Sequence, residues 1–268
     1  MVKVVVAGVG GRMGGRIVQL IAESKELIVA GAFEKADHPS INKDLGEWLG
    51  IGKTGQTIVA DPEEVIHQGQ VLIDFTYHSA SLEHLRLAAT RKIPAVIGST
   101  GFTAQELEEI RELCQTVPCV LTPNMSVGVN VLFKVVRDVA LALGKGFDIE
   151  ILEVHHKMKK DAPSGTALKL AQVLAQTRSQ NLDEVAVYER RGIIGERRPE
   201  EIGIQTFRAG DIIGEHTVLF GGMGERIEIT HRAHSRDTFA RGALRAARWI
   251  IDQKNGLYDM QDVLGLKG

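Results

Sequence analysis

Cysteine is scarce in this sequence, and its scarcity limits the available chemistry. The 268 residues include two cysteines, Cys114 and Cys119. Two cysteines make neither a disulfide framework nor a zinc site. Cys114 falls in a helical pattern and Cys119 in an apolar run after Pro118, so we expect both in the core. A reducing, cytoplasmic location is the expectation that follows.

A strong charge of one sign and long apolar runs are also absent. The formal net charge is −2, from 32 Lys and Arg against 34 Asp and Glu, which excludes a globally basic nucleic-acid binder. No apolar run has the length of a membrane span. The opening residues, MVKVVVAGVGG, lack the layout of a signal peptide. We therefore expect neither a nucleic acid nor a membrane as a partner.

Proline is rare as well, with seven prolines against 29 glycines. This balance is typical of many tight turns without a low-complexity linker. The remaining composition, 44% hydrophobic and 25% charged, is that of an ordinary globular protein. The chain is long enough to divide into two domains.

The N-terminal segment has the layout of a dinucleotide-binding βαβ unit. Residues 2–7 form an apolar run typical of a buried parallel strand. Five glycines follow within residues 8–15, a helical pattern covers residues 12–23, and a second apolar run covers residues 27–33. An acidic residue, Glu34, ends that run. This order of elements indicates a Rossmann-type nucleotide site.

The glycine spacing differs from the usual G-x-G-x-x-G, whose third glycine would fall at Met13. The spacing that fits is G-x-x-G-x-x-G, at Gly8, Gly11 and Gly14. It still permits a tight turn, a close backbone approach to a pyrophosphate, and close packing of helix on strand. Turn glycines alone would explain such a motif, but its place between a strand and a helix favours nucleotide binding.

Two neighbouring residues bear on the choice of cofactor. Glu34 is expected to accept a hydrogen bond from an adenosine ribose hydroxyl, which favours NAD. Lys35, with Arg12 and Arg16, could instead hold a 2′-phosphate. The sequence therefore favours tolerance of both cofactors, although an ordinary exposed lysine would equally explain Lys35.

Strands and helices alternate up to residue 126, which predicts an α/β fold with a doubly wound parallel sheet. We expect a loop over residues 36–55 and strands at 57–60, 71–75, 94–98 and 117–121, with helices opening at Asp61-Pro62 and covering 79–91 and 103–114. Parallel sheets bind ligands at the carboxyl ends of their strands. We place three strand-end loops around the nicotinamide: residues 74–76, 98–102 and 122–126.

A second, α+β domain is expected after residue 126. Residues 127–143 form a long apolar helical run, and residues 147–151 alternate apolar and polar side chains. Later strands are expected at 202–208, 212–220 and 225–231, in a mixed or antiparallel sheet. A helix over 238–251 and a short tail should return to the first domain. The predicted division is 1–126 with 239–268, and 127–238, the second domain binding substrate and forming a homo-oligomer.

The stretch from Glu153 to Ala167 carries the chemistry of the second domain. It reads E-V-H-H-K-M-K-K-D-A-P-S-G-T-A and ends in a helix start that Ser164 or Thr166 could cap. Histidines, ammonium groups and a helix N-terminus suit an anionic substrate that must also be protonated. Adjacent histidines on a strand point to opposite faces, so His155 and His156 share a site only at a strand end. Lysine neighbours argue against a metal site there.

Seven motifs in order make the resemblance specific. They are V-A-G-V-G-G-R-M-G, D-F-T, G-S-T-G-F, T-P-N-M-S-V-G-V-N, E-V-H-H-K-M-K-K-D-A-P-S-G-T-A, R-A-G-D-I-I-G-E-H-T and E-I-T-H-R-A-H-S-R. The chain closely resembles the 4-hydroxy-tetrahydrodipicolinate reductase (dihydrodipicolinate reductase) family of bacterial lysine and diaminopimelate biosynthesis. The resemblance implies a Rossmann-type domain with a second α+β substrate domain, a homotetramer, and hydride transfer from NADH or NADPH to a small cyclic dicarboxylate.

The resemblance also implies roles for individual residues. His155 would donate or accept a proton, Lys159 would be the second proton donor, and His156 would bind a substrate carboxylate. The amides of Gly165 and Thr166 would receive a carboxylate at the helix start. The implied cofactor-binding residues are Gly8, Val9, Gly10, Gly11, Arg12, Met13, Glu34, Lys35, Gly98, Ser99, Thr100, Thr122, Pro123, Asn124 and Met125. No metal site is implied.

Two departures and two alternatives accompany the resemblance. Gly98-Ser99-Thr100 replaces a commoner G-T-T, and Met125 takes a place that is usually aromatic, which weakens any expectation of stacking there. A semialdehyde dehydrogenase would need a catalytic cysteine at a sheet loop, where neither cysteine is expected. A nucleotide-sensing protein without catalysis would predict substitutions in the His155–Lys159 pair, and both residues are present.

Overall fold

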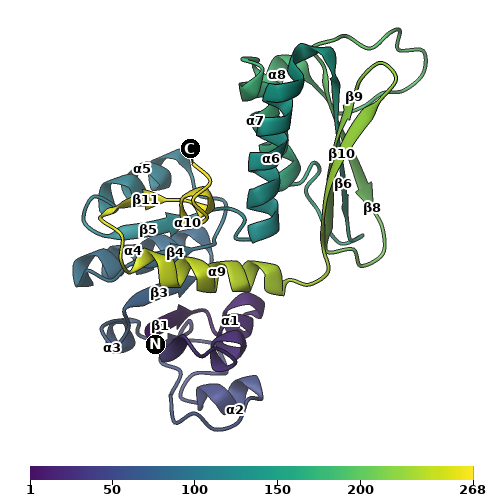
Figure 1. Cartoon of the computed structure of the whole chain (residues 1–268). Helices are drawn as coiled ribbons and strands as arrows, with labels where there is room; N and C mark the ends of the chain where they lie inside the picture. Colours follow the sequence, from purple (N-terminus) through teal and green to yellow (C-terminus); the bar gives the residue numbers. More distant parts are fainter. Residues whose placement is uncertain (268) are drawn as a thin grey trace. The chain divides into compact units, whose positions relative to one another are not determined.

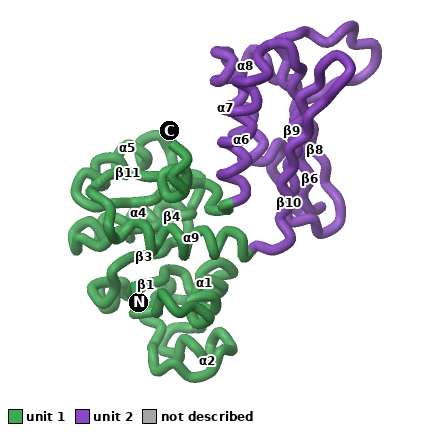
Figure 2. Tube along the Cα trace, viewed as in Figure 1, with its two compact units in different colours: residues 1–127, 237–268 green, residues 128–236 purple. Residues whose placement is uncertain are grey.

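The computed structural model describes residues 1–267 and divides them into two compact units. Unit 1 holds residues 1–127 and 237–268, and unit 2 holds residues 128–236 (Figure 2). The two units are described separately below. No helix in the described range 1–267 is long and apolar enough to cross a membrane.

Unit 1 is built on a six-stranded parallel sheet, so the predicted α/β class is confirmed (Figure 1). The strand order is β11-β5-β4-β3-β1-β2. Its elements are β1 (Val2–Ala7), α1 (Arg12–Ala22), β2 (Leu27–Phe33), α2 (Leu45–Leu49), α3 (Glu63–Ile66), β3 (Val71–Asp74), α4 (His78–Arg91), β4 (Ala95–Ile97), α5 (Ala104–Leu113), β5 (Pro118–Leu121), α9 (Asp237–Ile250), β11 (Gly256–Tyr258) and α10 (Met260–Val263).

Two hydrophobic layers cover the two faces of this sheet. Alternate residues of β1 face opposite ways: Val4 and Val6 join α1 and α9 in one layer, while Val5 and Ala7 join α4 and the end of α5 in the other. Burial on both faces is what a near-continuous apolar strand permits. The strand order reverses between β1 and β3, which creates a crevice at their carboxyl ends.

Three details of unit 1 differ from expectation. The strand predicted at residues 57–60 is wrong: two isolated bridges, Phe33↔Val59 and Asp44↔Thr57, occur there instead, because the segment pairs with two different partners. The loop predicted over residues 36–55 contains α2, which Asp44 caps through the amides of Gly46 and Glu47. The C-terminal tail forms β11, which pairs with β5.

Unit 2 is built on a five-stranded mixed sheet, as expected for an α+β unit. The order is β10-β9-β6-β8-β7, with β6, β8 and β7 parallel and β9 antiparallel to both neighbours. Its elements are α6 (Val127–Leu143), the 3₁₀ turn η1 (Gly144–Gly146), β6 (Asp148–His155), α7 (Gly165–Thr177), α8 (Leu182–Val185), β7 (Ala186–Val187), β8 (Ile202–Arg208), β9 (Gly214–Gly221) and β10 (Arg226–Ala233).

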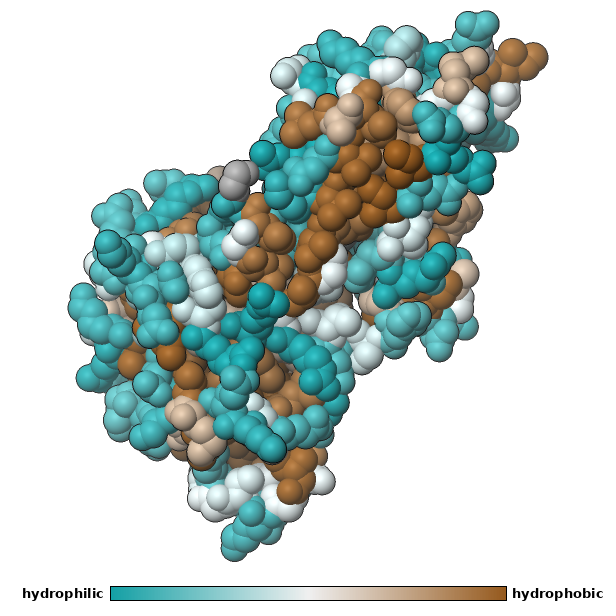
Figure 3. Space-filling model, viewed as in Figure 1, coloured by the Kyte–Doolittle hydropathy of each residue, from teal (hydrophilic) through white to brown (hydrophobic). Residues whose placement is uncertain are grey.

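Helices α6 and α7 cover one face of this sheet (Figure 1). Ile149 and Ile151 of β6, Ile204 of β8 and Val218 of β9 point into that layer. Strand β6 runs four residues beyond the strand expected at 147–151, ending at His155. The outward side of α6 is apolar and shows as a brown band in Figure 3, with Val131 40% exposed.

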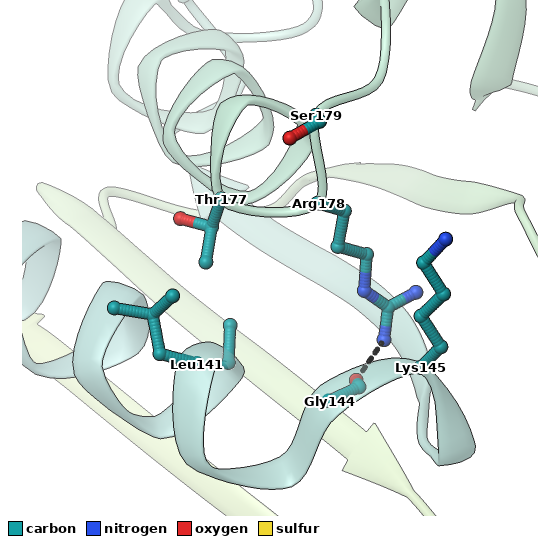
Figure 4. Close-up of a pocket in the computed structure, with 7 residues that line it drawn as sticks. Leu141, Gly144, Lys145, Thr177, Arg178 and Ser179 are labelled. Atoms are coloured by element: carbon teal, nitrogen blue, oxygen red, sulfur yellow. Dashed lines mark hydrogen bonds between the residues drawn. The ribbon is translucent and has the colours of Figure 1, made fainter.

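A hollow of about 320 Å³ lies at the C-terminal ends of α6 and α7 (Figure 4). The guanidinium of Arg178 donates to the carbonyl oxygens of Gly144 and Phe147, so it closes the end of α6. None of the predicted site residues lines this hollow; the lining residues are Ala140, Leu141, Gly144, Lys145, Thr177, Arg178 and Ser179.

Candidate functional site

The glycine-rich turn between β1 and α1 meets the geometric needs of a dinucleotide phosphate. Gly8 has a φ of +65°, a left-handed conformation that favours glycine. A Cβ on Gly14 would lie 2.2 Å from the carbonyl oxygen of Gly8, so only glycine allows α1 to start this close to β1. Gly11 is the N-cap of α1 and supplies no side-chain cap. This backbone fits the cofactor that the sequence predicts.

Glu34 and Lys35 lie beside this turn. The carboxylate of Glu34 accepts from the amide of Gly10 at 2.9 Å and from the amide of Lys35 at 2.9 Å. The ammonium of Lys35 pairs with Asp37 at 3.2 Å and is largely exposed. Contacts of either residue with a ribose or a 2′-phosphate stay predictions. Of the other predicted turn residues, Val9 is buried and Arg12 is exposed, while Met13 packs on the core.

The loops after β3 and β4 are held together by a buried carboxylate. Asp74 is 0% exposed and accepts from the amide and hydroxyl of Thr76, both at 2.7 Å, and from Ser81 at 2.8 Å. Its other oxygen bonds His84 at 2.6 Å. Burial by itself would raise the pKa of Asp74, but the bonds from His84 and Thr76 outweigh it and lower the pKa. Asp74 is therefore a charged anchor for this edge of the sheet.

The predicted strand-end residues meet at that edge. The hydroxyl of Ser99 donates to the carbonyl of Thr76 at 2.9 Å, which joins the loops after β4 and β3. A Cβ on Gly98 would lie 2.1 Å from the ring of Phe75, so glycine is required there. Gly8 also meets this group, because its Cβ would lie 2.7 Å from Thr76.

The loop after β5 is placed differently from its neighbours. Thr122 is buried, and its hydroxyl lies 3.3 Å from the carbonyl of Asn124. The side chain of Met125 is 1% exposed and belongs to the core with α9. Any contact of Met125 with a cofactor would thus come from its backbone. Pro123 and Thr100 are exposed.

In unit 2 the end of β6 brings an acid and a histidine to the same face. Glu153 and His155 are two residues apart, so their side chains point the same way. Both are buried, and Nδ1 of His155 lies 2.5 Å from a carboxylate oxygen of Glu153. Strand β6 ends at His155, so the side chain of His156 need not point to the opposite face of the sheet. This meets the condition, stated from the sequence, under which both histidines can serve one site.

Three further groups surround Glu153. Arg208 donates to both of its oxygens at 2.9 Å, and the amide of Ser164 donates at 3.0 Å. Burial alone would raise the pKa of Glu153, but the bonds from His155, Arg208 and Ser164 bring it to about 2. Glu153 is therefore a carboxylate at neutral pH.

A second histidine, His216, lies against the first. The ring centroids of His155 and His216 are 5.2 Å apart, with the rings edge to face. Burial and the charge of His155 hold the pKa of His216 at about 3, so its imidazole is neutral at pH values near 7. Its Nε2 lies 3.1 Å from the hydroxyl of Ser164.

The lysines and the start of α7 complete the predicted site. Nζ of Lys159 donates to both oxygens of Asp161 at 2.9 Å. The surroundings of Lys159 therefore include the carboxylate of Asp161. Ser164 is the N-cap of α7, while Gly165 and Thr166 occupy its first two positions. Nothing lies within 4 Å of a Cβ placed on Gly165.

Several residues of this site were missed from the sequence. Glu153 could have been found from its i, i+2 spacing to His155, which the strand period makes a same-face pair. Arg208 and His216 lie on β8 and β9, 55 residues from Glu153 and 52 residues from Ser164. Both fall in the motif R-A-G-D-I-I-G-E-H-T, but no local pattern links them to Glu153 or Ser164. Neither cysteine can serve a semialdehyde dehydrogenase, since Cys114 and Cys119 are at most 1% exposed. Among the described residues, no group of three or more potential ligands could hold a metal.

Known proteins of one family are similar to this chain along its length. The model "Dihydrodipicolinate reductase, N-terminus" matches residues 2–125, and "Dihydrodipicolinate reductase, C-terminus" matches residues 128–264. A 4-hydroxy-tetrahydrodipicolinate reductase from Syntrophus aciditrophicus is 60% identical, with 100% of both chains covered. One from Geotalea uraniireducens is 55% identical at the same coverage.

Solved structures show the same likeness. The dipicolinate-bound dihydrodipicolinate reductase of Paenisporosarcina sp. TG-14 has a TM-score of 0.78 and 25% identity, covering 98% of each chain. An amine dehydrogenase from Mycobacterium smegmatis has a TM-score of 0.61 at 15% identity, covering 96% of this chain and 94% of its own, which is a likeness of fold alone.

Proposed function

The chain belongs to the dihydrodipicolinate reductase family, and on that premise we propose how its residues carry out the reaction. The protein is an NAD(P)H-dependent 4-hydroxy-tetrahydrodipicolinate reductase of lysine and diaminopimelate biosynthesis. It yields tetrahydrodipicolinate. The observation that carries the proposal is the buried Glu153–His155 pair at the end of β6, since it supplies a proton-transfer group within a family of reductases.

Unit 1 binds NADH or NADPH, which supplies the hydride when bound. Glycine at position 14 lets α1 pack close to the end of β1, so the backbone amides of the turn can bind the pyrophosphate. Glu34 binds the adenosine ribose, and Lys35 accommodates a 2′-phosphate by leaving Asp37. Residues 98–100, on the edge that Asp74 organises, contact the nicotinamide half of the cofactor, as do residues 122–125.

Unit 2 binds the cyclic dicarboxylate and manages its protons. His156 and the amides of Gly165 and Thr166 hold the carboxylates, because an anion is favoured at a helix start. The 4-hydroxyl group leaves with a ring proton as water, and hydride addition to the resulting conjugated ring leaves negative charge that a proton must neutralise. Lys159 donates that proton, and His155 donates or accepts the second. Before substrate binds, the ammonium of Lys159 pairs with the carboxylate of Asp161.

The proposed assembly is a cytoplasmic homotetramer. The face of the unit 2 sheet opposite α6 and α7 carries apolar side chains, of which Phe207 is 54% exposed. Leu152 and Val154 of β6 share that face, as does Leu219 of β9, by strand alternation and register. Uncovered apolar sheet faces are typical of interfaces between subunits.

The test supplies the protein with freshly made synthase product and follows oxidation of NADH and of NADPH. The expected result is oxidation of at least one cofactor, dependent on the added product. Absence of oxidation with both cofactors would overturn the proposed activity. Sedimentation of the same preparation measures the assembly, where a monomer would overturn the tetramer.

A further inference from the structure

The two oxygens of the buried Glu153 carboxylate bond different groups, and the two groups of bonds have different functions. One oxygen, Oε1, accepts from the Ser164 amide at 3.0 Å, from Thr206 Oγ1 at 3.2 Å and from Arg208 Nη2 at 2.9 Å. The other, Oε2, accepts from Arg208 Nη1 at 2.9 Å and meets His155 Nδ1 at 2.5 Å. Buried charges need such complete pairing. The Oε1 side ties three elements together, whereas the Oε2 side acts on the catalytic histidine.

The bond at Oε2 determines which nitrogen of His155 carries a proton. A carboxylate only accepts hydrogen bonds, so Nδ1 of His155 must be the donor. In the neutral imidazole this leaves Nε2 as the bare nitrogen, able to take a proton. Nε2 lies next to Gly214, where a Cβ would be 3.0 Å away. The absence of a side chain at Gly214 keeps Nε2 accessible.

The Oε1 side also reaches the loop that carries Lys159, through Arg208. Nη2 of Arg208 donates to the carbonyl of Asp161 at 2.6 Å, and the side chain of Asp161 receives Lys159. Arg208 therefore connects Glu153 to the lysine loop, and Ser164 connects it to the start of α7. Glu153 is thus connected to the end of β6, to the lysine loop and to the start of α7.

We infer that Glu153 is a positioning residue for proton transfer: it fixes His155 as the Nδ1–H tautomer and so presents Nε2 to the substrate. This inference rests on the proposed function, in which His155 transfers a proton. A carboxylate that served only to bind Arg208 would not need the bond from His155 Nδ1 to Oε2.

Glu153→Gln tests the role with little change of shape. Three donors converge on Oε1, so the amide oxygen of the glutamine takes that place. Its NH₂ takes the place of Oε2, where it faces Nδ1 of His155 and gives up the bond from Arg208 Nη1. The NH₂ donates, which forces the proton of His155 onto Nε2. We expect kcat to fall by about 100-fold or more, in the range typical of general acid–base catalysis, with KM changed by about twofold at most.

Glu150→Gln is the matched control. Glu150 lies on the same strand but on the opposite face, and it also pairs with an arginine, Arg190, at 2.8 Å. We expect this variant to keep the kcat of the unchanged protein. A Glu153→Gln variant with an unchanged kcat, or with equal losses in kcat and in NADH binding, would overturn the positioning role.

A spectroscopic measurement on the unchanged protein does not depend on activity. Solid-state ¹⁵N spectra of histidine-labelled protein, assigned with a His155→Asn variant, report the tautomer of His155. We expect a protonated Nδ1 and a bare Nε2 in the neutral imidazole of His155. A protonated Nε2 with a bare Nδ1 would overturn the inference. The proposed function fails separately, if the unchanged protein oxidises neither NADH nor NADPH.

Discussion

Replacing Glu153 by glutamine should destabilise the protein by an amount that depends on pH. Glutamine resembles the neutral form of the acid, so the variant measures what the charge contributes. With a pKa of about 2 in the folded chain and about 4.3 in an unfolded one, the carboxylate contributes about 3 kcal/mol at about pH 7 and about 1.4 kcal/mol at about pH 3. Solvent does not screen this contribution, because Glu153 is 0% exposed.

The sign follows from the direction of the pKa shift. The folded pKa of Glu153 lies below the unfolded value, so the stabilisation is complete above about pH 5 and disappears as the pH falls toward about 2. The difference in free energy of unfolding between the unchanged protein and the variant should therefore shrink by about half between neutral pH and about pH 3.

Urea unfolding followed by circular dichroism measures this difference at fixed protein concentration. The Glu150→Gln control should show a smaller loss, because its ion pair is partly solvated, with Glu150 27% and Arg190 25% exposed. A difference for Glu153→Gln that stays constant from neutral pH to about pH 3 would refute the reasoning, since the charge of Glu153 would then not be its source.

Three further changes test the proposed roles. Lys159→Ala should lower kcat by about 100-fold while leaving NADH affinity within about twofold; an equal loss in single-turnover rate and in affinity would assign Lys159 a structural role. Lys35→Ala should weaken NADPH binding more than NADH binding in fluorescence titrations, and an unchanged ratio would rule out contact with the 2′-phosphate. Gly14→Ala should destabilise unit 1 by about 1–3 kcal/mol and weaken both cofactors, because its Cβ would collide with backbone. Gly146→Ala, in open space, should change the unfolding curve by less than about 0.5 kcal/mol.

Elements with strong burial patterns were predictable to the residue. Strands β1 and β2 and helix α6 coincide with the expected ranges, because continuous apolar runs of strand length and a long apolar helical run leave little choice of boundaries. Residues 57–60 and helix α2 were mispredicted for the opposite reason. They are short, and their structure depends on partners such as Phe33 and on the cap at Asp44.

The candidate site was likewise predictable only in part. The motif from Glu153 to Ala167 led to His155 and Lys159, but not to the groups around them. Arg208 reaches Glu153 from a strand far along the chain, and the neutral state of His216 results from tertiary burial. The core position of Met125 likewise depends on α9, where Gly242 packs against its carbonyl. Such contacts exist only after the sheets have formed.

Deuterium transfer tests the central claim most directly. Reduced nicotinamide carrying deuterium at the transferable C4 position is supplied with freshly made synthase product, and the product is analysed by mass spectrometry. The reductase assignment predicts a single deuterium in each molecule of tetrahydrodipicolinate, formed in proportion to the cofactor oxidised. Oxidised cofactor without deuterium in the product, or no oxidation of either cofactor, would contradict it.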